Sequence, residues 1–562
     1  MKEILLVNLT RMGDLIQTTP VLTGLKKKHP DARVTLLVNS SFKEICKDLP
    51  SIDNLIECDM VGFRTMARDE EYTLVECFRR IEEFIDEVNR TRYDLVVSFT
   101  ASKEAMMLSS LINAREMRGV TTGADGTRVI RHPWQRYFMG EITFRRCNPF
   151  HLCDMMIKSA EIPHTGDSLS LSVSDEESAK AKALLSRHGV GEGDLLVGFH
   201  LGANQEVRAW PPASFARLGD RLAGSLSARI LITGSELESA LGKEYEAAAA
   251  SKAVNLIGKT DLRETAALLK RCSLMVSNDT GPLHMATAVG TTVIELPFGH
   301  ACFRETGPYG ENHYVAEADI SCIPCGHYVK CLNHRCKELV TPEAVFELAS
   351  RILSNVRVEA LEDGQVWEGV RVFRSFFAPD GMQDYVPLIR RPLTSDAFYQ
   401  YLYRETWPFI LDGVHGFSAE KAVASIEAKT SAWHGENGLA ELLRGIGEDF
   451  STLRKMEALA GDALKKITLV RKEAKKSSPN VKLIKGAWKD APAIDREIEK
   501  LGRVHPALMA PFLLFRLGKE SLEGKDLAPM AETAVGLYAD LKEHFSMLAK
   551  TIGLLIEKHV NA

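Results

Sequence analysis

The first third of the chain alternates short apolar runs with stretches in which apolar residues recur at helical spacing. Three apolar runs have the length of buried strands: 4–7, 34–38 and 95–99. Between the first two runs, four apolar residues recur at near-helical spacing: Leu15, Ile16, Leu22 and Leu25. This pattern predicts a β-α-β unit within a parallel α/β sheet.

A second series of strand-like runs follows a connecting stretch, 162–193, that contains Pro, Gly, Ser and Asp. Each run of this series ends in a polar or glycine-containing turn. The runs are 195–199, 229–233, 254–257, 274–277 and 292–296. The sequence therefore predicts two successive Rossmann-like α/β domains, 1–170 and 171–355.

The pattern changes near Val356. One more strand-like run stands at 370–377, but after Pro392 the apolar spacing is almost wholly helical. Two helical faces are formed by Ile446, Phe450, Leu453, Leu464 and Ile467, and by Val535, Tyr538, Leu541, Phe545, Leu548, Ile552 and Leu555. We expect a mainly helical extension over 356–562, either a packed bundle or a long coiled coil, and the scarcity of sustained heptads favours the bundle.

Composition narrows the class of protein. The 562 residues are 45% hydrophobic and 26% charged, with a formal net charge of -5, as in a soluble globular protein. No global positive field exists to hold nucleic acid, so we expect no nucleic-acid partner. The apolar run at the start is only 4–7, and no run is long enough to span a bilayer, which predicts a cytoplasmic protein. The helical extension is a candidate surface for oligomerisation.

The first motif whose residues could take part in catalysis or binding is Thr10-Arg11-Met12-Gly13-Asp14, which follows a strand and opens a helix. Loops at the carboxyl ends of parallel strands line the ligand crevice of α/β sheets, so Asp14 is placed for catalysis. The alternative is an N-cap that accepts backbone N–H bonds. Neither Gly-x-Gly-x-x-Gly nor a Walker-type loop is present, which weakens the case for dinucleotide or P-loop binding.

The second motif is Ser277-Asn278-Asp279-Thr280-Gly281-Pro282-Leu283-His284, again a strand followed by a helix start. Free N–H groups and the positive end of a helix dipole form an anion site there, which suits a diphosphate. The alternative is a capped turn, with Pro282 near the first helical position and Asp279 or Thr280 as the cap. Taken alone, His284 is typical of a hydrogen-bonded interior histidine.

The third motif is His200-Leu201-Gly202-Ala203-Asn204, at the end of the first strand of the second domain, followed by Arg208-Ala209-Trp210-Pro211. The planar guanidinium of Arg208 can bind the oxyanions of a phosphate leaving group. As an isolated residue it would be a surface charge.

Together the motifs resemble glycosyltransferase family 9, the ADP-heptose:lipopolysaccharide heptosyltransferases. The resemblance covers about 1–355 and rests on Met12-Gly13-Asp14 with Thr18-Thr19-Pro20, on 208–211 and on 278–286. It implies a GT-B fold, an α/β architecture of two facing Rossmann-like domains with the acceptor on the N-terminal side and the donor on the C-terminal side. The implied reaction is inverting transfer of a heptose-type sugar from ADP-heptose or a related nucleotide sugar to a lipopolysaccharide core or other bacterial surface glycan, with no metal in the active site.

The same resemblance implies residue roles. Asp14 matches the general base, and Arg208 falls where the family commonly has a lysine that steadies the departing diphosphate. Glu238, after Thr233-Gly234-Ser235, stands near the position that contacts the nucleoside ribose. The implied donor-binding set is Asn204, Glu238, Asp279, Thr280, Gly281 and His284, and the acceptor-side loop includes Arg11 and Gly13. A glycan or lipid-linked acceptor implies peripheral contact with the inner face of the inner membrane.

Four of the eleven cysteines are clustered and the other seven are scattered, as suits a reducing compartment. The cluster Cys322, Cys325, Cys331 and Cys336 has the spacing C-x2-C-x5-C-x4-C and predicts a tetrahedral site for zinc or iron, in which His327 or His334 could replace a thiolate. The alternative is reduced thiols or a disulfide pair. Similar segments in some family 9 members imply a structural role.

Two rival functions are compatible with parts of the pattern. One is a nicotinamide or flavin oxidoreductase on the same sheet, which lacks its glycine fingerprint. The other is a non-catalytic assembly module that uses residues 393–562 as its interaction surface, against which the retention of Asp14, Asp279, Thr280 and a basic residue at 208 argues. The sequence does not specify the sugar or the acceptor.

Overall fold

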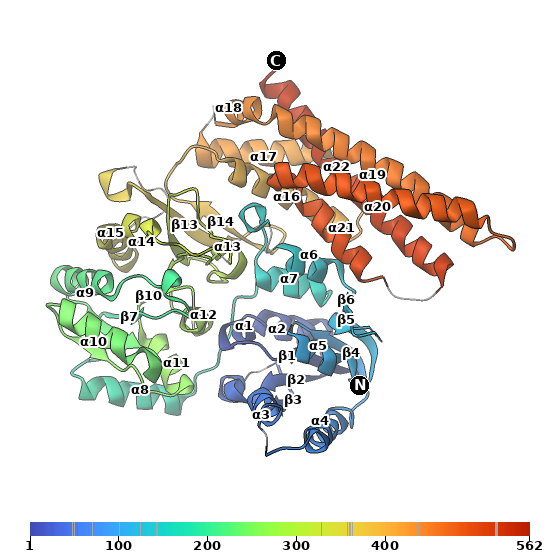
Figure 1. Ribbon diagram of the computed structural model, residues 1–562. Coiled ribbons are helices and arrows are strands. Elements are labelled where there is room, and N and C mark those ends of the chain that lie inside the picture. The colour runs from blue at the N-terminus through green and yellow to red at the C-terminus, as the bar shows by residue number, and fades with distance from the viewer. Residues whose placement is uncertain are drawn as a thin grey trace. The chain divides into compact units, whose positions relative to one another are not determined.

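The computed structural model describes residues 1–561 except 48, 50, 70, 101, 124, 142–143, 328, 357, 359–360, 362–363, 436–437 and 523–525. The chain divides into two compact units, which are taken in turn (Figure 1). The first unit comprises Met1–Thr100, Leu111–Arg118 and Phe150–Ile389, and the second comprises Ala101–Ser110, Gly119–Pro149 and Arg390–Ala562.

The first unit begins with a sheet whose central strand is β1 (Glu3–Asn8). This strand pairs in parallel with β2 (Arg33–Asn39) on one side and with β4 (Tyr93–Ser98) on the other. β3 (Asn54–Cys58) pairs with β2, and β5 (Ala114–Thr122) follows β4 in the sheet order. The three predicted strands of this segment are confirmed. Its helices are α1 (Met12–Ile16), α2 (Thr19–Lys28), η1 (Ser40–Cys46), α3 (Met60–Met66), α4 (Leu74–Val88) and α7 (Leu152–Ser159).

A second sheet of the first unit has the order β14-β13-β12-β11-β10-β7-β8-β9. β7 to β12 run parallel to one another, whereas β13 pairs antiparallel with β12 and β14 pairs antiparallel with β13 at one edge. The five predicted strands and the run 370–377 are confirmed within about two residues at their ends. The strands are β7 (Leu196–His200), β8 (Arg229–Thr233), β9 (Ala253–Asn255), β10 (Leu274–Asn278), β11 (Val293–Leu296), β12 (Tyr314–Ala318), β13 (Val370–Phe377) and β14 (Gln383–Pro387).

Along the chain, helices connect successive strands of this second sheet, as parallel pairing requires. They are α8 (Asp175–Arg187), η3 (Glu206–Arg208), α9 (Pro212–Leu226), η4 (Glu236–Glu238), α10 (Ser239–Ala248), α11 (Leu262–Arg271), α12 (Gly281–Ala288), α13 (Phe303–Thr306), α14 (Arg335–Leu339), α15 (Pro342–Leu353) and η5 (Gln365–Trp367).

In each sheet the order in which successive strands are added reverses at one strand. β1 lies between β2 and β4, and β7 lies between β10 and β8. Ligands of open α/β sheets bind outside the carboxyl ends of the strands at such switch points. The turns that follow β1, β7 and β10 are therefore where a binding site is expected, and these turns carry the three sequence motifs.

A buried tryptophan anchors the segment after β7. Trp210 is fully buried, its ring centroid lies 4.9 Å from that of Phe215, and its Nε1 donates to the Val340 carbonyl at 3.0 Å. Pro212 occupies the first position of α9, where a missing N–H costs no helical hydrogen bond. Packing of Trp210 thus fixes the chain immediately after Arg208.

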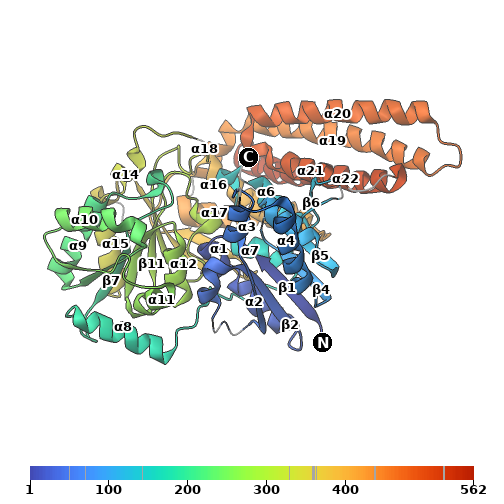
Figure 2. The ribbon, with the colours of Figure 1, turned by 60° about the horizontal axis from the view of Figure 1, so that its bottom comes forward.

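The second unit is mainly helical. Its long helices lie side by side in both views: α22 packs along α19, α20 packs on α19, and α21 packs on α22 and α6 (Figures 1 and 2). These helices form the bundle that the apolar spacing favoured. The elements are α5 (Lys103–Ser110), β6 (Arg128–Ile130), α6 (Pro133–Glu141), η2 (Arg145–Cys147), α16 (Ser395–Leu411), α17 (Ala419–His434), α18 (Gly438–Gly445), α19 (Gly447–Ala474), α20 (Val481–Val504), η6 (Pro506–Leu508), α21 (Ala510–Glu520) and α22 (Leu527–His559).

The two units are built from discontinuous segments, whereas the predicted domains are continuous ranges with boundaries at 170 and 355. Those boundaries stay predictions. The strand run at 370–377 joins the sheet of the first unit, and that unit extends to Ile389. Within the described residues, every helix is either too short or too polar to cross a bilayer.

Candidate active site

The turn after β1 is folded by Asn8, the last residue of that strand. Its Oδ1 accepts the Thr10 backbone N–H at 3.1 Å, and its Nδ2 donates to the Asp14 carbonyl at 3.1 Å. These bonds bring the chain directly from β1 into α1, so that Arg11 is the N-cap residue and Asp14 lies in the first helical turn. Asp14 is therefore not the N-cap residue, although its carboxylate accepts the Arg11 backbone N–H.

The Asp14 carboxyl is largely buried. Burial raises its pKa above the usual 3.8, the Arg11 N–H and the Arg11 charge oppose that rise, and the Asp279 carboxylate adds to it. The residue keeps part of its surface exposed. A partly accessible carboxyl with a raised pKa is the kind of group that can accept a proton from a substrate hydroxyl. Arg11, exposed beside it, also lies in this loop.

Two glycines allow the start of α1 to approach the start of α12. A Cβ on Gly13 would lie 2.9 Å from His284 Cδ2 and 3.4 Å from Gly281 Cα. A Cβ on Gly281 would lie 2.5 Å from Met12 Cε. A side chain at Gly13 would press on the His284 ring, and one at Gly281 would displace the end of the Met12 side chain, so glycine at both positions allows the close approach. The first and second motifs, about 270 residues apart in the chain, thus meet in the first unit.

The start of α12 is tied to the turn after β7 by Asn278, which is completely buried. Its Nδ2 donates to the carbonyls of Leu201 and Gly202, each at 3.0 Å, and its Oδ1 accepts the Trp210 N–H at 2.9 Å. Thr280 is the N-cap residue, but within the described residues its hydroxyl makes no capping bond. The positive end of α12 is consequently left for an external anion.

Arg208 and Asp279 form a buried ion pair at this helix start. Arg208 Nη2 donates to Asp279 Oδ2 at 2.6 Å and to the Asp279 carbonyl at 2.8 Å. Their side chains are only 13% and 7% exposed, so the pair is shielded from solvent. Among the described residues Arg208 Nε is buried and has no hydrogen-bond partner.

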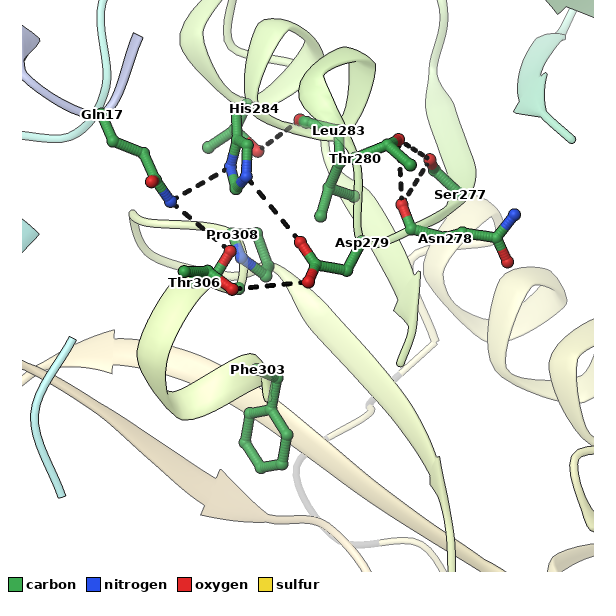
Figure 3. A network of polar contacts seen from close by, with 12 residues as sticks. Gln17, Ser277, Asn278, Asp279, Thr280, Leu283, His284, Phe303, Thr306 and Pro308 are labelled. Atoms are coloured by element: carbon green, nitrogen blue, oxygen red, sulfur yellow. Dashed lines mark hydrogen bonds and ion pairs between the residues drawn. The ribbon is translucent and has the colours of Figure 1, made fainter. Parts of the chain in front are cut away.

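His284 connects Asp279 to the N-terminal segment of the same unit (Figure 3). Its Nδ1 lies 3.5 Å from Gln17 Nε2, which also approaches the Thr306 carbonyl at 3.4 Å, and its Nε2 lies 4.0 Å from Asp279 Oδ1. Burial lowers the pKa of His284 to about 4, although Asp279 raises it, so the ring is neutral at pH 7. Since Nδ1 accepts from an amide, the ring proton is on Nε2, facing Asp279.

Three residues missed from the sequence complete this network. Gln17 closes α1 and is fully buried, and Thr306 Oγ1 of α13 lies 3.4 Å from Asp279 Oδ2. Glu295 on β11 is in register with Ser277 on β10, is fully buried, and has no partner for either carboxyl oxygen among the described residues. Burial, then the charge of Asp279, raises the pKa of Glu295 well above its usual value. The sequence signal that could have identified Glu295 is that it is a lone acid inside the apolar run 293–296.

Glu238 lies beside the carboxyl ends of β7 and β8. Its Oε2 accepts the Ser235 N–H at 2.7 Å and the Ser235 hydroxyl at 2.9 Å, and its Oε1 lies 3.3 Å from His200 Nε2. Oε1 also occupies the space that a Cβ on Gly202 would need. The carboxylate is thus in the crevice at the switch point. Asn204 is exposed in the neighbouring loop, and the described contacts do not join it to this set.

The four thiols of the cysteine cluster differ in exposure. Cys322 is exposed, Cys325 and Cys331 are partly exposed, and Cys336 is buried. Among the described residues, no group of three or more His, Cys, Asp or Glu side chains is arranged to hold a metal ion. The metal site therefore receives no support from the geometry and stays a prediction.

The matching family model and the curated relatives are heptosyltransferases. Residues 84–335 match the family model described as glycosyltransferase family 9 (heptosyltransferase). The chain is 23% identical over 286 residues to lipopolysaccharide heptosyltransferase 3 of Escherichia coli, covering 50% of this chain and 80% of that one. It is 22% identical over 373 residues to lipooligosaccharide heptosyltransferase 2 of Haemophilus influenzae, covering 63% of this chain and 99% of that one.

A solved structure confirms the fold. The family 9 glycosyl transferase from Veillonella parvula matches with a TM-score of 0.53 and 24% identity, over 63% of this chain and 98% of that one. The architecture is the expected GT-B arrangement with a helical C-terminal region. The predicted family and enzyme class are confirmed, and the oxidoreductase alternative is not supported. The comparisons indicate a transferase, and residues 84–335 of the chain are similar to glycosyltransferase family 9.

Proposed function

We propose that this enzyme transfers a heptose from a nucleotide-diphosphate sugar, with ADP-heptose as the donor, to the core of lipopolysaccharide or a related surface glycan, with inversion at the anomeric carbon. The observation that carries the proposal is the approach of α1 to α12. It places a partly accessible carboxyl, Asp14, beside the Arg208–Asp279 pair and an uncapped helix start. Heptosyltransferases from Escherichia coli and Haemophilus influenzae are among its relatives.

In the proposed reaction Asp14 is the general base. An acceptor hydroxyl oxygen attacks the anomeric carbon of the donor while its proton passes to the Asp14 carboxylate. The bond between the anomeric carbon and the diphosphate oxygen breaks, and its electron pair leaves with the nucleoside diphosphate. A single displacement of this kind inverts the configuration, and it requires Asp14 to be ionised before attack.

The donor diphosphate is proposed to bind at the start of α12. A diphosphate carries about two negative charges, whereas a helix N-terminus supplies about half a positive charge, so a cation is also required. Arg208, whose guanidinium lies at this helix start, is the proposed cation. The Asp279 carboxylate would repel a phosphate, and we infer that it instead accepts hydrogen bonds from sugar hydroxyls, while Thr280 and Gly281 face the phosphates.

The nucleoside is proposed to lie over the ends of β7 and β8. Glu238 Oε1 points into that crevice at Gly202, and a carboxylate there can accept both hydroxyls of a ribose. The acceptor is proposed to enter on the side of Arg11 and Gly13. We further propose that the enzyme acts in the cytoplasm and that the residues around Asp14 and Asp279 stabilise the leaving group without a metal.

The donor is tested with the purified chain and a panel of ADP-, UDP-, GDP- and dTDP-sugars, each with and without a lipopolysaccharide-core acceptor. We expect acceptor-dependent turnover with ADP-heptose and a product whose anomeric configuration, read by NMR, is opposite to that of the donor. Preferential turnover of another nucleotide sugar would contradict the donor assignment. Retention of configuration would contradict the single displacement.

Replacing Asp14 by Asn is expected to leave the fold intact and to lower kcat by about 100-fold or more, since the amide cannot accept the proton. In the parent enzyme kcat/KM should fall as the pH drops through an inflection above 3.8, because the pKa of Asp14 is raised and only its ionised form is active. That acidic limb should be absent in Asp14→Asn. Transfer by this variant within a few-fold of the parent would rule out the base.

Replacing Arg208 by Ala is expected to lower kcat by about 100-fold, more than it weakens donor binding, because charge on the leaving group grows in the transition state. Arg208→Lys should recover much of the rate. The Ala variant also leaves Asp279 as a buried carboxylate without its cation, so Arg208→Ala/Asp279→Asn serves as the stability control. Unchanged donor affinity by calorimetry together with unchanged turnover in Arg208→Ala would show that the phosphates bind elsewhere.

Chelation should not affect the transfer itself. Incubation with EDTA followed by desalting is expected to leave kcat unchanged, because the proposed charge stabilisation comes from Arg208 and α12. Zinc and iron analysis of protein purified without chelator decides the separate question of the cysteine cluster. A rate that falls on chelation and returns with added metal would overturn the metal-free mechanism.

A further inference from the structure

Helix α20 (Val481–Val504) of the second unit has one covered side and one uncovered side. It packs on α19, and its buried residues follow one stripe at spacings of three and four: Ala487, Ala491, Asp495, Ile498 and Gly502. Figure 2 shows α20 at the margin of the helical unit, with α19 beside it. The side away from that stripe is therefore open to solvent.

The uncovered side carries a cationic stripe. Six exposed basic residues recur at spacings of three, four or seven, which places them within an arc of about 60° on the helix and over about 32 Å of its length. We call this the α20 stripe. It consists of Lys482, Lys485, Lys489, Arg496, Lys500 and Arg503. Arg503 is bound to Glu499 at 2.8 Å, at one edge of the stripe.

The other acids of α20 do not neutralise the stripe, because they pair with neighbouring helices: Asp495 binds Lys519 of α21, and the other two bind α19. Asp490 lies 2.8 Å from Lys466 of that helix. Glu497 lies 3.3 Å from Lys455, also on α19. Among the described residues, the first three lysines of the stripe have no carboxylate within ion-pair distance. Positive charge therefore accumulates on the uncovered side of α20.

Large apolar side chains are exposed at the same end of the helix. Val481 is 56% exposed, Trp488 is 41% exposed and Leu483 is 38% exposed. Trp488 and Val481 border the α20 stripe on the helix surface, next to Lys485. Single exposed apolar residues are common, but a tryptophan and a valine beside unpaired lysines have the composition of an interfacial helix.

We propose that the α20 stripe, with Trp488 and Val481, binds an anionic phospholipid surface. The lysines would lie at the headgroups, and the indole would enter the interfacial region that tryptophan prefers. Nucleic acid would satisfy the cations but leaves the apolar residues unexplained, and the chain carries a net charge of -5. The proposal rests on the proposed function in one respect: a lipopolysaccharide acceptor has a lipid part, which a transferase must reach at a membrane surface.

The test measures sedimentation of the full chain with vesicles that contain phosphatidylglycerol and with vesicles of phosphatidylcholine alone. We expect binding to the former that weakens from low to high salt. Lys482→Glu/Lys485→Glu/Lys489→Glu should lower the partition coefficient at least about tenfold, since each lysine near an anionic surface contributes severalfold. Trp488→Ser should lower it by a smaller factor and remove the blue shift of tryptophan fluorescence on vesicle binding.

The matched control reverses three exposed lysines of the first unit, Lys180→Glu/Lys182→Glu/Lys243→Glu, and should bind vesicles as the parent does. Circular dichroism establishes that both triple variants are folded. Equal losses in the two triple variants, equal binding to both kinds of vesicle, or tighter binding to duplex DNA than to anionic vesicles would each overturn the proposal. Vesicle binding needs no transferase activity, so this result is independent of the donor and acceptor assignments.

Discussion

The site depends on the close contact between the beginnings of α1 and α12. Gly13 and Gly281 lack the side chains that would separate these helices, and the contact brings the residues after β1 against those after β10. Each turn alone is an ordinary strand-to-helix connection. Only when they meet does Asp14 share an environment with Asp279, and only then does Gln17 reach His284. The close approach of α1 and α12 at these two glycines is thus what brings the residues of the site together.

Burial then decides how these groups share charge. His284 is kept neutral, so Arg208 is the cation that faces Asp279 in the described network. Breaking a buried pair costs more than forming it gains, which makes the Arg208–Asp279 pair a rigid part of the site and not an adjustable one. A bound diphosphate would therefore add its contacts to an arginine that is already oriented, and little reorganisation would accompany transfer.

Much of the fold could be predicted because β1, β2, β7, β8, β10 and β11 are continuous apolar runs buried in parallel sheets. β3 and β5 were missed because they are partly exposed and mix polar with apolar residues. In the site, residues in the turns after strands were predicted, since position after a strand is visible in the sequence. Gln17 and Glu295 were not, because their significance comes from partners distant in the chain; Gln17 and His284 are 267 residues apart.

Glu295 shows how a charge-rich site tolerates a buried acid. If Glu295 were ionised, it would place a second negative charge beside Asp279, with no hydrogen-bond donor among the described residues to stabilise it. Burial and the Asp279 charge both raise its pKa, so both favour the protonated, neutral form, which does not compete with Asp279 for Arg208. The neutral acid also places no opposing charge near the start of α12. With Glu295 neutral, the field at the proposed donor site is set mainly by Arg208, Asp279, Asp14 and the helix terminus.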